Sequence, residues 1–387
     1  PDRRCPSFVD IMDAAGFQER LINDLATSMG VLQLYLGHRL KIFDAMRSFG
    51  TETPVTASAL ATKMQLSERY IVEFLKSCAV QGYLIKAPND EAAFILPAGH
   101  ASALCDREHP NYCAAFTCFL PSITPILGAL QEAFRTGGGM PYHDYGPDLL
   151  EGISEGNRPL YKHEMLQEWL PKTKVWDKLQ TPGAKILDVA CGEAWSTITL
   201  AKGLPHLTNV IDAVDLDEKS LELARQNIEA EGVSDRIALH HKYAHEVSDG
   251  DYDLIMICES LHDMHNPETV LKSLLPLLHD DGIVFVADEG VPDTEEEMLP
   301  KDPTKIGSPS DEPNNFLGRL NYGFSVLHCL PASKCWHSSA AIGTAIRPST
   351  LRAIAKSAGY DVEEVHHNGF WRFYQLTPLA PAKSQGA

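Results

Sequence analysis

The sequence predicts an α/β fold, in which a parallel sheet covered by helices on both faces follows a mainly helical N-terminal part. Two observations support this prediction. From Lys185 onward, short buried-strand patterns alternate with helical patterns, the order that βαβ units produce. Before that point, apolar residues recur at spacings of three and four, as on one face of a helix. We expect a helical dimerisation domain at residues 1–100, a helical connector or lid at 101–180 and the sheet domain at 181–387.

The composition is that of an acidic globular protein. Lysine and arginine total 33 against 52 aspartate and glutamate residues, a net charge of −19 that disfavours nucleic acid as a partner. No window approaches 18 uninterrupted apolar residues, so we expect no membrane span. The nine cysteines are scattered, and the two close pairs, Cys113/Cys118 and Cys329/Cys335, lack the spacing of a zinc or redox motif. We therefore predict reduced thiols, no metal and a cytoplasmic location.

Residues 8–50 have a helical pattern. The apolar stripe consists of Leu25, Met29, Leu32, Leu36, Leu40 and Phe43. The part of this stripe from Leu25 to Leu36 is more apolar than a small separate module should expose, so the sequence predicts a homodimer held mainly by the N-terminal helices.

Residues 54–97 have the pattern of a winged helix. We expect Thr56 to cap a short helix ending at Met64, and Ser67 to cap a second helix, Glu68 to Gln81. Strands at 83–85 and 93–96 would form the wing. The second helix has balanced charge, whereas a helix that reads DNA needs a basic face. Packing or dimerisation is therefore the favoured role of this module.

Residues 101–180 are expected to be mostly helical, with breaks at proline and glycine. A loop at 137–142 contains three consecutive glycines, and Tyr142, His143 and Tyr145 lie at its end. Two interpretations are open: a solvent-exposed connection, or a lid that lines a pocket.

The sheet domain divides into regular segments. We expect strands at 186–189, 210–214, 237–240, 252–258 and 283–287, with helices at 195–202 and 218–231. An acidic, proline-rich loop follows at 292–315, then helices at 316–330 and 348–358. The last strands, 361–366 and 370–376, should form an antiparallel hairpin at the sheet edge.

The first strand runs into the turn Asp188-Val189-Ala190-Cys191-Gly192-Glu193-Ala194. Small residues at the carboxyl end of a parallel strand let the backbone approach a ligand closely. The segment resembles the first motif of class I S-adenosylmethionine (SAM)-dependent methyltransferases, although Ala190 and Ala194 stand where glycine is usual. The resemblance implies a Rossmann-like domain that binds SAM and releases S-adenosylhomocysteine (SAH), with Asp188, Ala190, Cys191 and Gly192 at the cofactor.

A carboxylate follows the second strand. Asp215 comes 27 residues after Asp188, and an ionised carboxylate at this strand tip can accept both ribose hydroxyl hydrogen bonds. We expect Asp217 to cap the next helix, which leaves Asp215 for the ribose, with Leu216 beside it. NAD is a competing ligand, but the turn lacks the Gly-x-Gly-x-x-Gly pattern.

The adenine contact departs from the family pattern. Most members of the resembled family present an aspartate after the third strand, whereas this chain has Tyr243 followed by Ala244. Tyr243 would stack on the adenine or fill the space. Glu259, directly after the fourth strand, is a further candidate for the cofactor site.

The fourth strand leads into Leu261-His262-Asp263-Met264. This segment resembles plant-type small-molecule O-methyltransferases, which implies that His262 is the general base. A near-neutral imidazole can take a hydroxyl proton as the oxygen attacks. Asp288 is the first candidate to orient the ring and Asp263 the second. The alternative is that Asp263 caps a helix and His262 has no catalytic part.

The order of modules resembles that of mycobacterial-type winged-helix methyltransferases. The resemblance implies methyl transfer to a small, largely apolar molecule, at a hydroxyl in the leading interpretation. The candidate substrate contacts are aromatic and histidine side chains: Tyr142, His143, Tyr145, Phe324, His328 and Trp336. Two alternatives stay open. The scaffold could catalyse a cyclisation, dehydration or decarboxylation with bound SAM, or the chain could be a non-enzymatic regulator.

Overall fold

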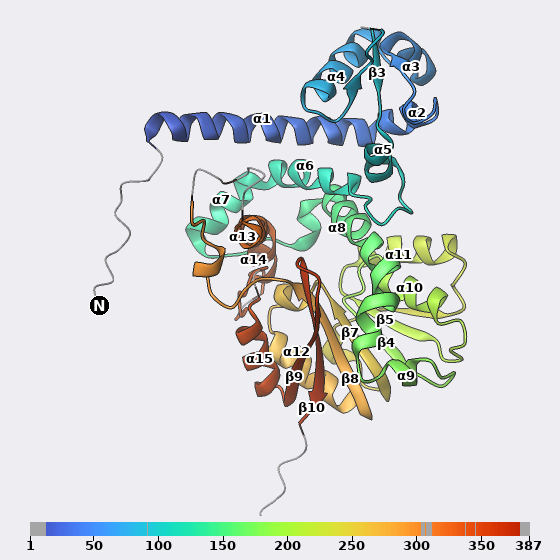
Figure 1. The fold of residues 1–387 in the computed structure, drawn as a ribbon. Coiled ribbons are helices and arrows are strands. Elements are labelled where there is room, and N and C mark those ends of the chain that lie inside the picture. The colour runs from blue at the N-terminus through green and yellow to red at the C-terminus, as the bar shows by residue number, and fades with distance from the viewer. Residues whose placement is uncertain are drawn as a thin grey trace, which may run out of the picture. The chain divides into compact units, whose positions relative to one another are not determined.

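The computed structural model describes residues 13–90, 92–302, 306, 312–336, 338–344 and 346–379 (Figure 1). The chain divides into two compact units. Among the described residues, the first unit comprises 13–124, 147–159 and Asp302, and the second comprises 125–146, 160–301 and those from 306 onward. Residues 101–180 thus contribute to both units.

The first unit contains the winged helix. Its helices are α1 (Ala14–Arg39), α2 (Ile42–Arg47), α3 (Ala57–Met64), α4 (Glu68–Val80), α5 (Ala98–Cys105), η2 (Ala114–Cys118), α6 (Phe119–Ile123) and most of α8 (Pro147–Leu160). The short strands β1 (Val55–Thr56), β2 (Ile85–Lys86) and β3 (Ala93–Ile95) form an antiparallel sheet in the order β1-β3-β2. The Thr56 cap is confirmed, since its hydroxyl accepts from the Ala59 N–H at 3.2 Å. Ser67 is the N-cap residue of α4 as predicted, although its side chain makes no capping hydrogen bond.

The long N-terminal helix is interrupted, contrary to the single helix predicted for 8–50; residues 8–12 lie outside the described residues. α1 ends at Arg39, Lys41 takes a left-handed φ of 58°, and α2 follows. The turn lets Ile42, Phe43 and Met46 enter the core of the winged helix. Most of the apolar stripe on α1 stays exposed.

The second unit is built on a seven-stranded sheet. Its strands are β4 (Ile186–Val189), β5 (Ile211–Asp215), β6 (Ile237–His241), β7 (Tyr252–Cys258), β8 (Leu278–Glu289), β9 (Tyr360–His367) and β10 (Trp371–Pro378). Their order is β6-β5-β4-β7-β8-β10-β9; β4 to β8 run parallel, and β10 pairs antiparallel with both β8 and β9. The predicted α/β class and the closing edge hairpin are confirmed.

Helices cover both faces of this sheet (Figure 1). On one face, α10 (Trp195–Gly203), α11 (Glu218–Ala230) and the π-helical segment η5 (Tyr161–Trp169) share a core cluster with side chains of the strands. On the other face, α12 (Pro267–Leu274) and α15 (Pro348–Ser357) do the same. Strands buried on both sides explain the nearly continuous apolar runs in the sequence.

The remaining segments of the second unit are α7 (Leu127–Thr136), η4 (Tyr142–Tyr145), η6 (Leu170–Lys172), α9 (Trp176–Leu179), η7 (Ala244–Glu246), η8 (Leu261–Asp263), η9 (Leu275–Leu277) and η10 (Glu296–Met298). The segment predicted as a long acidic loop at 292–315 contains η10, and α13 (Pro313–Phe324) begins inside it; residues 303–305 and 307–311 lie outside the described residues. The helix predicted for 316–330 continues from α13 into a π-helical turn, η12 (Ser325–Cys329), and then α14 (Leu330–Ser333).

One helical stretch among the described residues, Ala114–Thr136, is long and apolar enough to cross a membrane by length and composition. It is broken into the short segments η2, α6, η3 (Thr124–Ile126) and α7, and 44% of its most apolar window is buried inside the protein. Such a stretch is equally typical of buried helices in water-soluble proteins.

Candidate active site

The candidate residues gather at the carboxyl ends of the parallel strands. The chain leaves β4 at Ala190, β5 at Leu216, β7 at Glu259 and β8 just after Glu289. β4 is the first strand of the seven-stranded sheet along the chain, and its neighbours β5 and β7 lie on opposite sides of it. The connection that follows β4 therefore leads to one side of the sheet, and a later connection leads to the other side. Ligands of open α/β sheets bind at such a point.

The turn after β4 keeps its shape without the usual glycines. Ala190 and Ala194 both take left-handed backbone angles, with φ of 57° and 66°, and Gly192 between them has a φ of 53°. An L-residue adopts this conformation at a cost of about 1–2 kcal/mol, so the two alanines preserve the turn at some expense of stability. No atom lies within 4 Å of the position of a Cβ at Gly192, apart from its chain neighbours. The turn therefore has the open backbone face that a nucleoside requires.

Asp188, near the end of β4, holds the residues that follow this turn. Its Oδ2 accepts hydrogen bonds from the hydroxyls of Ser196 and Thr197, both at 2.6 Å, at the start of α10. The side chain is buried, and burial raises the pKa of the carboxyl to about 6 although the two hydroxyl hydrogen bonds oppose the shift. Asp188 thus acts on the site through the position of the turn.

Asp215 lies at the tip of β5 with its carboxylate held by backbone. The N–H groups of Gly192 and Asp217 each donate to one of its oxygens at 2.8 Å. Burial raises the pKa of Asp215, against these backbone hydrogen bonds. Each oxygen keeps a second acceptor position, so the carboxylate can still take two hydroxyl donors. Asp217 caps α11 by accepting from the Ser220 N–H at 2.8 Å, as predicted.

The other predicted cofactor residues lie at or after the carboxyl ends of β4, β5 and β6. Leu216 is exposed directly after β5, and Tyr243 and Ala244 follow β6, where Tyr243 precedes η7. Cys191 is buried, and its N–H donates to the Val214 carbonyl of β5 at 3.1 Å.

Glu259 follows β7 in a left-handed conformation, with a φ of 51°. Its N–H donates to the Ala287 carbonyl of β8 at 2.8 Å. This bond ties the chain at the tip of β7 to the neighbouring strand just before His262.

His262 is buried among carboxylates. Its Nδ1 lies 2.6 Å from Oδ1 of Asp288 and 3.2 Å from Oε2 of Glu289, and its Nε2 lies 3.3 Å from Oδ1 of Asp263. Asp288 and Glu289 are almost fully buried, whereas the Asp263 side chain is 26% exposed. Asp288 thus holds Nδ1, whereas Nε2 faces Oδ1 of Asp263, an oxygen that is itself buried.

The charges around the ring determine its protonation. Burial alone lowers the pKa of His262, but the charges of Asp288, Glu289 and Asp263 outweigh it and raise the pKa well above 6.5. Burial raises the pKa of Glu289 well above its usual range, and the charge of Asp288 adds to this effect. Burial raises the pKa of Asp288, but the charge of His262 together with hydrogen bonds from Glu289 and His262 outweighs burial and lowers the pKa. These pKa shifts describe one protonation state. His262 is an imidazolium paired with an Asp288 carboxylate, and Glu289 beside them is protonated.

The interpretation of Asp263 as a helix cap is wrong. α12 is capped by Asn266, whose Oδ1 accepts from the Thr269 N–H at 3.0 Å. Asp263 instead ends η8 with its carboxylate beside His262.

Three of the predicted substrate contacts lie together. The ring of His328 packs edge-on against Tyr142 and Tyr145, with centroid distances of 5.5 and 4.7 Å. The hydroxyl of Tyr145 donates to the Leu327 carbonyl at 2.9 Å and so anchors η4 to η12. Burial lowers the pKa of His328, which keeps this second imidazole neutral, and its Nε2 is buried without a hydrogen-bond partner.

Tyr142 is half-buried and lies within electrostatic reach of both parts of the site. Burial raises the pKa of its phenol well above 10, and the charges of Asp215 and Asp263 add to the effect. The glycine loop thus leads into a half-buried tyrosine whose ring lies against His328.

The other predicted substrate contacts lie in different surroundings. His143 is not brought to this cluster, since its side chain is 61% exposed beside Asp144. Phe324 is half-buried at the end of α13. Trp336 packs against Tyr243 and His265, with ring centroids 6.0 and 5.3 Å away, and so lies beside the residue that follows β6.

Sequence reasoning missed two residues, Glu289 and Cys329. Glu289 is adjacent to Asp288, and strand alternation would place it on the opposite face; because β8 ends there, both side chains reach His262. The Cys329 thiol lies within 4.8 Å of ligand atoms of His262 and Asp263. The π-helical turn brings successive residues His328 and Cys329 into this region, and such turns are frequent at functional sites.

The glycine loop is anchored to the backbone of α14. Met140 N–H donates to the Pro331 carbonyl at 2.9 Å, and a Cβ at Gly139 would lie 2.2 Å from backbone atoms of Lys334 and Cys335. Gly139→Ala should therefore force the two segments apart and lower the free energy of unfolding by about 1–3 kcal/mol, as overpacking does. Denaturant unfolding measures this, with Gly138→Ala as the matched control, since its nearest neighbour is the Thr136 hydroxyl at 3.2 Å. Equal stability of the two variants would contradict the close packing.

Comparison with known proteins adds two domain assignments. Residues 180–322 match the family model described as a methyltransferase domain, and residues 27–106 match the Rv2258c-like winged helix-turn-helix domain. Among curated relatives, the ubiquinone biosynthesis O-methyltransferase of Shewanella sp. (strain ANA-3) is 27% identical over 104 residues, which is 27% of this chain and 42% of that protein. The chain thus spans less than half the length of such a relative.

Solved structures resemble the chain along most of its length. Human N-acetylserotonin methyltransferase in complex with SAM has a TM-score of 0.68 at 15% identity, covering 97% of this chain and 100% of that one. An O-methyltransferase family protein from Burkholderia thailandensis has a TM-score of 0.65 at 16% identity, covering 96% and 100%. At these identities the likeness concerns the fold.

Proposed function

We propose that this chain, which has the class I SAM-dependent methyltransferase fold and carries a winged helix-turn-helix domain at 27–106, transfers a methyl group from SAM to a hydroxyl of a small, largely apolar molecule. The observation that carries the proposal is the placement of His262. It lies in η8, just after β7, with Asp288 on Nδ1 and the Asp263 carboxylate beside Nε2. The tip of β5, with Asp215, belongs to the same edge of the sheet.

The residues around the β4 turn fit the cofactor. Asp215 would take the ribose hydroxyls, the backbone from Ala190 to Gly192 would face the nucleoside, and Leu216, Tyr243, Ala244 and Glu259 would border it. When bound, SAM supplies an electrophilic methyl group on a positively charged sulfur and leaves as SAH. The open face at Gly192 and the oriented Asp215 carboxylate support this assignment.

His262 would remove the proton of the acceptor hydroxyl. In its neutral form Nδ1–H donates to Asp288, which fixes the tautomer and leaves Nε2 as the acceptor of that proton. The Asp288 carboxylate then stabilises the imidazolium that forms. The charge of Asp263 adds to this stabilisation, since it also favours the protonated ring.

The acceptor side of the site favours an aromatic, weakly acidic substrate. Tyr142 and His328 present ring surfaces there, with Tyr145 behind them and Phe324 as a further candidate. A phenol retains its proton at neutral pH and so needs a base, whereas a thiolate does not.

Incubation with methyl-labelled SAM and a panel of small phenols tests the proposed reaction. We expect label in an organic-soluble product together with one SAH for each methyl transferred. SAM binding without SAH formation on any phenol of the panel would oppose it and favour the alternative of a non-methyl-transfer reaction on the same scaffold.

We also propose a homodimer formed through α1. Leu25, Met29 and Leu36 are each about half exposed on this helix, and an apolar stripe of this length marks an association surface. The double variant Leu25→Glu/Met29→Glu should convert a dimer to a monomer, because charge on a buried interface is costly. Light scattering measures this, with Tyr70→Glu on α4, 80% exposed, as the control. A monomeric wild-type protein at micromolar concentration would contradict the proposal.

The winged helix would then serve in packing or dimerisation and would not bind DNA. On α4, Arg69 is paired with Glu73, which leaves little free positive charge for phosphates.

We further propose a cytoplasmic enzyme that needs no membrane partner. The free thiols of the eight cysteines in the described residues support a reducing compartment.

A further inference from the structure

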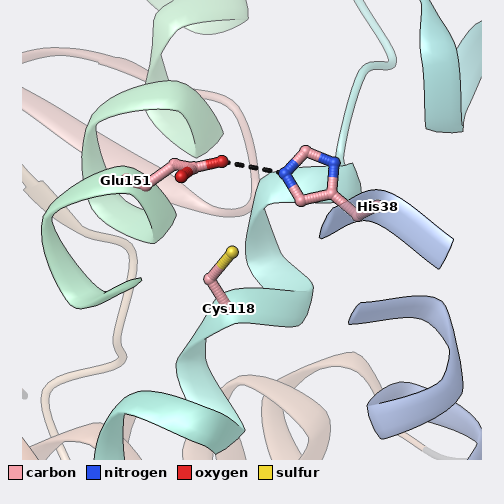
Figure 2. A group of neighbouring side chains, drawn as sticks. All are labelled: His38, Cys118 and Glu151. Atoms are coloured by element: carbon pink, nitrogen blue, oxygen red, sulfur yellow. Dashed lines mark hydrogen bonds and ion pairs between the residues drawn. The ribbon is translucent and has the colours of Figure 1, made fainter. Parts of the chain in front are cut away.

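We propose that His38, Cys118 and Glu151 form a Zn²⁺ site that fastens three helical segments of the first unit. The three residues come from α1, from the end of η2 and from α8 (Figure 2). They are 80 and 33 positions apart in the sequence, in the order given. A shared ion would therefore cross-link segments that the chain connects only distantly.

The geometry suits a small tetrahedral ion. One ligand atom from each residue lies within 4.8 Å of the other two, and His38 Nε2 is 2.8 Å from Glu151 Oε1. Zinc binds nitrogen and oxygen at about 2.0 Å and sulfur at about 2.3 Å, which places the ligands of one ion roughly 3.3–3.7 Å apart. The ion thus needs the imidazole and carboxylate to separate by about half an ångström and the thiol to turn toward them.

The donor set selects zinc over the abundant hard cations. One imidazole, one thiol and one carboxylate form the mixed set that Zn²⁺ prefers, whereas Mg²⁺ and Ca²⁺ require oxygen ligands. His38 and Cys118 are buried, and the Glu151 side chain is 32% exposed, so water can reach a fourth position on the glutamate side.

The charges around the cluster also balance. A thiolate and a carboxylate would neutralise the ion, while Arg39 contacts both Glu151 and Asp148. Arg39 bonds the Glu151 oxygen that does not face His38, so it orients the carboxylate as outer partners of metal ligands do. The Tyr35 hydroxyl holds Asp148 on the far side at 2.8 Å.

Metal binding would be coupled to deprotonation of the thiol. Zinc binds cysteine as the thiolate, and Cys118 is fully buried beside the other two ligands. The ion must displace the thiol proton, and its affinity should rise with pH.

Cobalt substitution tests the site without reference to activity. Chelator-treated full-length protein titrated with Co²⁺ should bind one ion per chain at this site, with the thiolate-to-cobalt charge-transfer band and the intense visible bands of tetrahedral Co²⁺. Cys118→Ser should lose the charge-transfer band, and Glu151→Gln, which can keep a hydrogen bond to His38, should bind at least tenfold more weakly. Zn²⁺ should displace the cobalt and raise the midpoint of thermal unfolding.

Two matched variants make the result specific. Cys113→Ser removes an exposed thiol five residues away and should leave the spectrum unchanged. Cys329→Ser removes the thiol beside His262, the other mixed cluster of metal-type ligands in the described residues, and should also leave it unchanged. The proposal is overturned if wild-type protein shows no charge-transfer band, if Cys118→Ser retains it, or if Cys329→Ser abolishes it.

Discussion

His262→Ala should lower the rate of methyl transfer by about 10²–10⁴-fold, the usual loss when a general base is removed. SAM affinity should stay nearly unchanged, because the imidazole acts on the acceptor hydroxyl and not on the nucleoside. Rate measurements with saturating SAM and a phenol acceptor, together with calorimetric titration of SAM, separate the two effects. The expected signature is a fall in kcat without a matching change in Kd.

The pH profile provides the sharper test of this role. Only the neutral imidazole can accept a proton, and the surrounding carboxylates raise the pKa of His262 well above 6.5. The rate should therefore rise with pH through that pKa and level off above it. Asp288→Asn removes one of the charges that raise the pKa, so the rising limb should move to lower pH while the maximal rate falls.

A control histidine far from the chemistry completes the experiment. His279 lies beside Asp253 with a side chain 42% exposed, and His279→Ala should keep both the rate and the profile of the wild type. A near-wild-type rate for His262→Ala on the authentic substrate would reject the general base. The search would then turn to Tyr142 and the neutral His328.

Asp215→Ala should weaken SAM binding by about 1.5–3 kcal/mol, or roughly 10- to 150-fold in Kd, the usual contribution of hydrogen bonds to a charged acceptor. The loss arises because the carboxylate is already oriented by the Gly192 and Asp217 N–H groups and can offer both oxygens to the ribose. Calorimetry with SAM and with SAH measures it.

Asp217→Ala is the matched control two residues away. Asp217 caps α11, so its removal should lower the free energy of unfolding by about 0.5–2 kcal/mol and leave SAM affinity close to that of the wild type. The reverse pattern, with affinity lost in Asp217→Ala and kept in Asp215→Ala, would contradict the assignment of the ribose contact.

The sheet domain could be predicted because its sequence pattern is strong. Strands buried on both faces give continuous apolar runs, and β7 was predicted with its observed bounds, Tyr252–Cys258. Asp215 and Asp288 come directly after predicted strands, and His262 lies four residues beyond one. The roles of His262 and Asp288 rest on the resemblance to plant-type O-methyltransferases.

Other features depend on tertiary contacts that no local pattern records. The break at Lys41 exists because Phe43 and its neighbours must turn into the winged-helix core. The π-helical turn that brings Cys329 toward His262 has no sequence signal that we recognise. The approach of Gly139 to the backbone of α14 joins residues almost 200 positions apart, beyond the reach of periodicity.

A crystal structure of the protein with bound SAH tests the central claim most directly. The account predicts both ribose hydroxyls within hydrogen-bond distance of the Asp215 carboxylate, the backbone of the Ala190–Gly192 turn against the nucleoside, and the sulfur on the side of the site that Nε2 of His262 faces. A nucleoside bound away from Asp215, or with its sulfur directed away from His262, would contradict it.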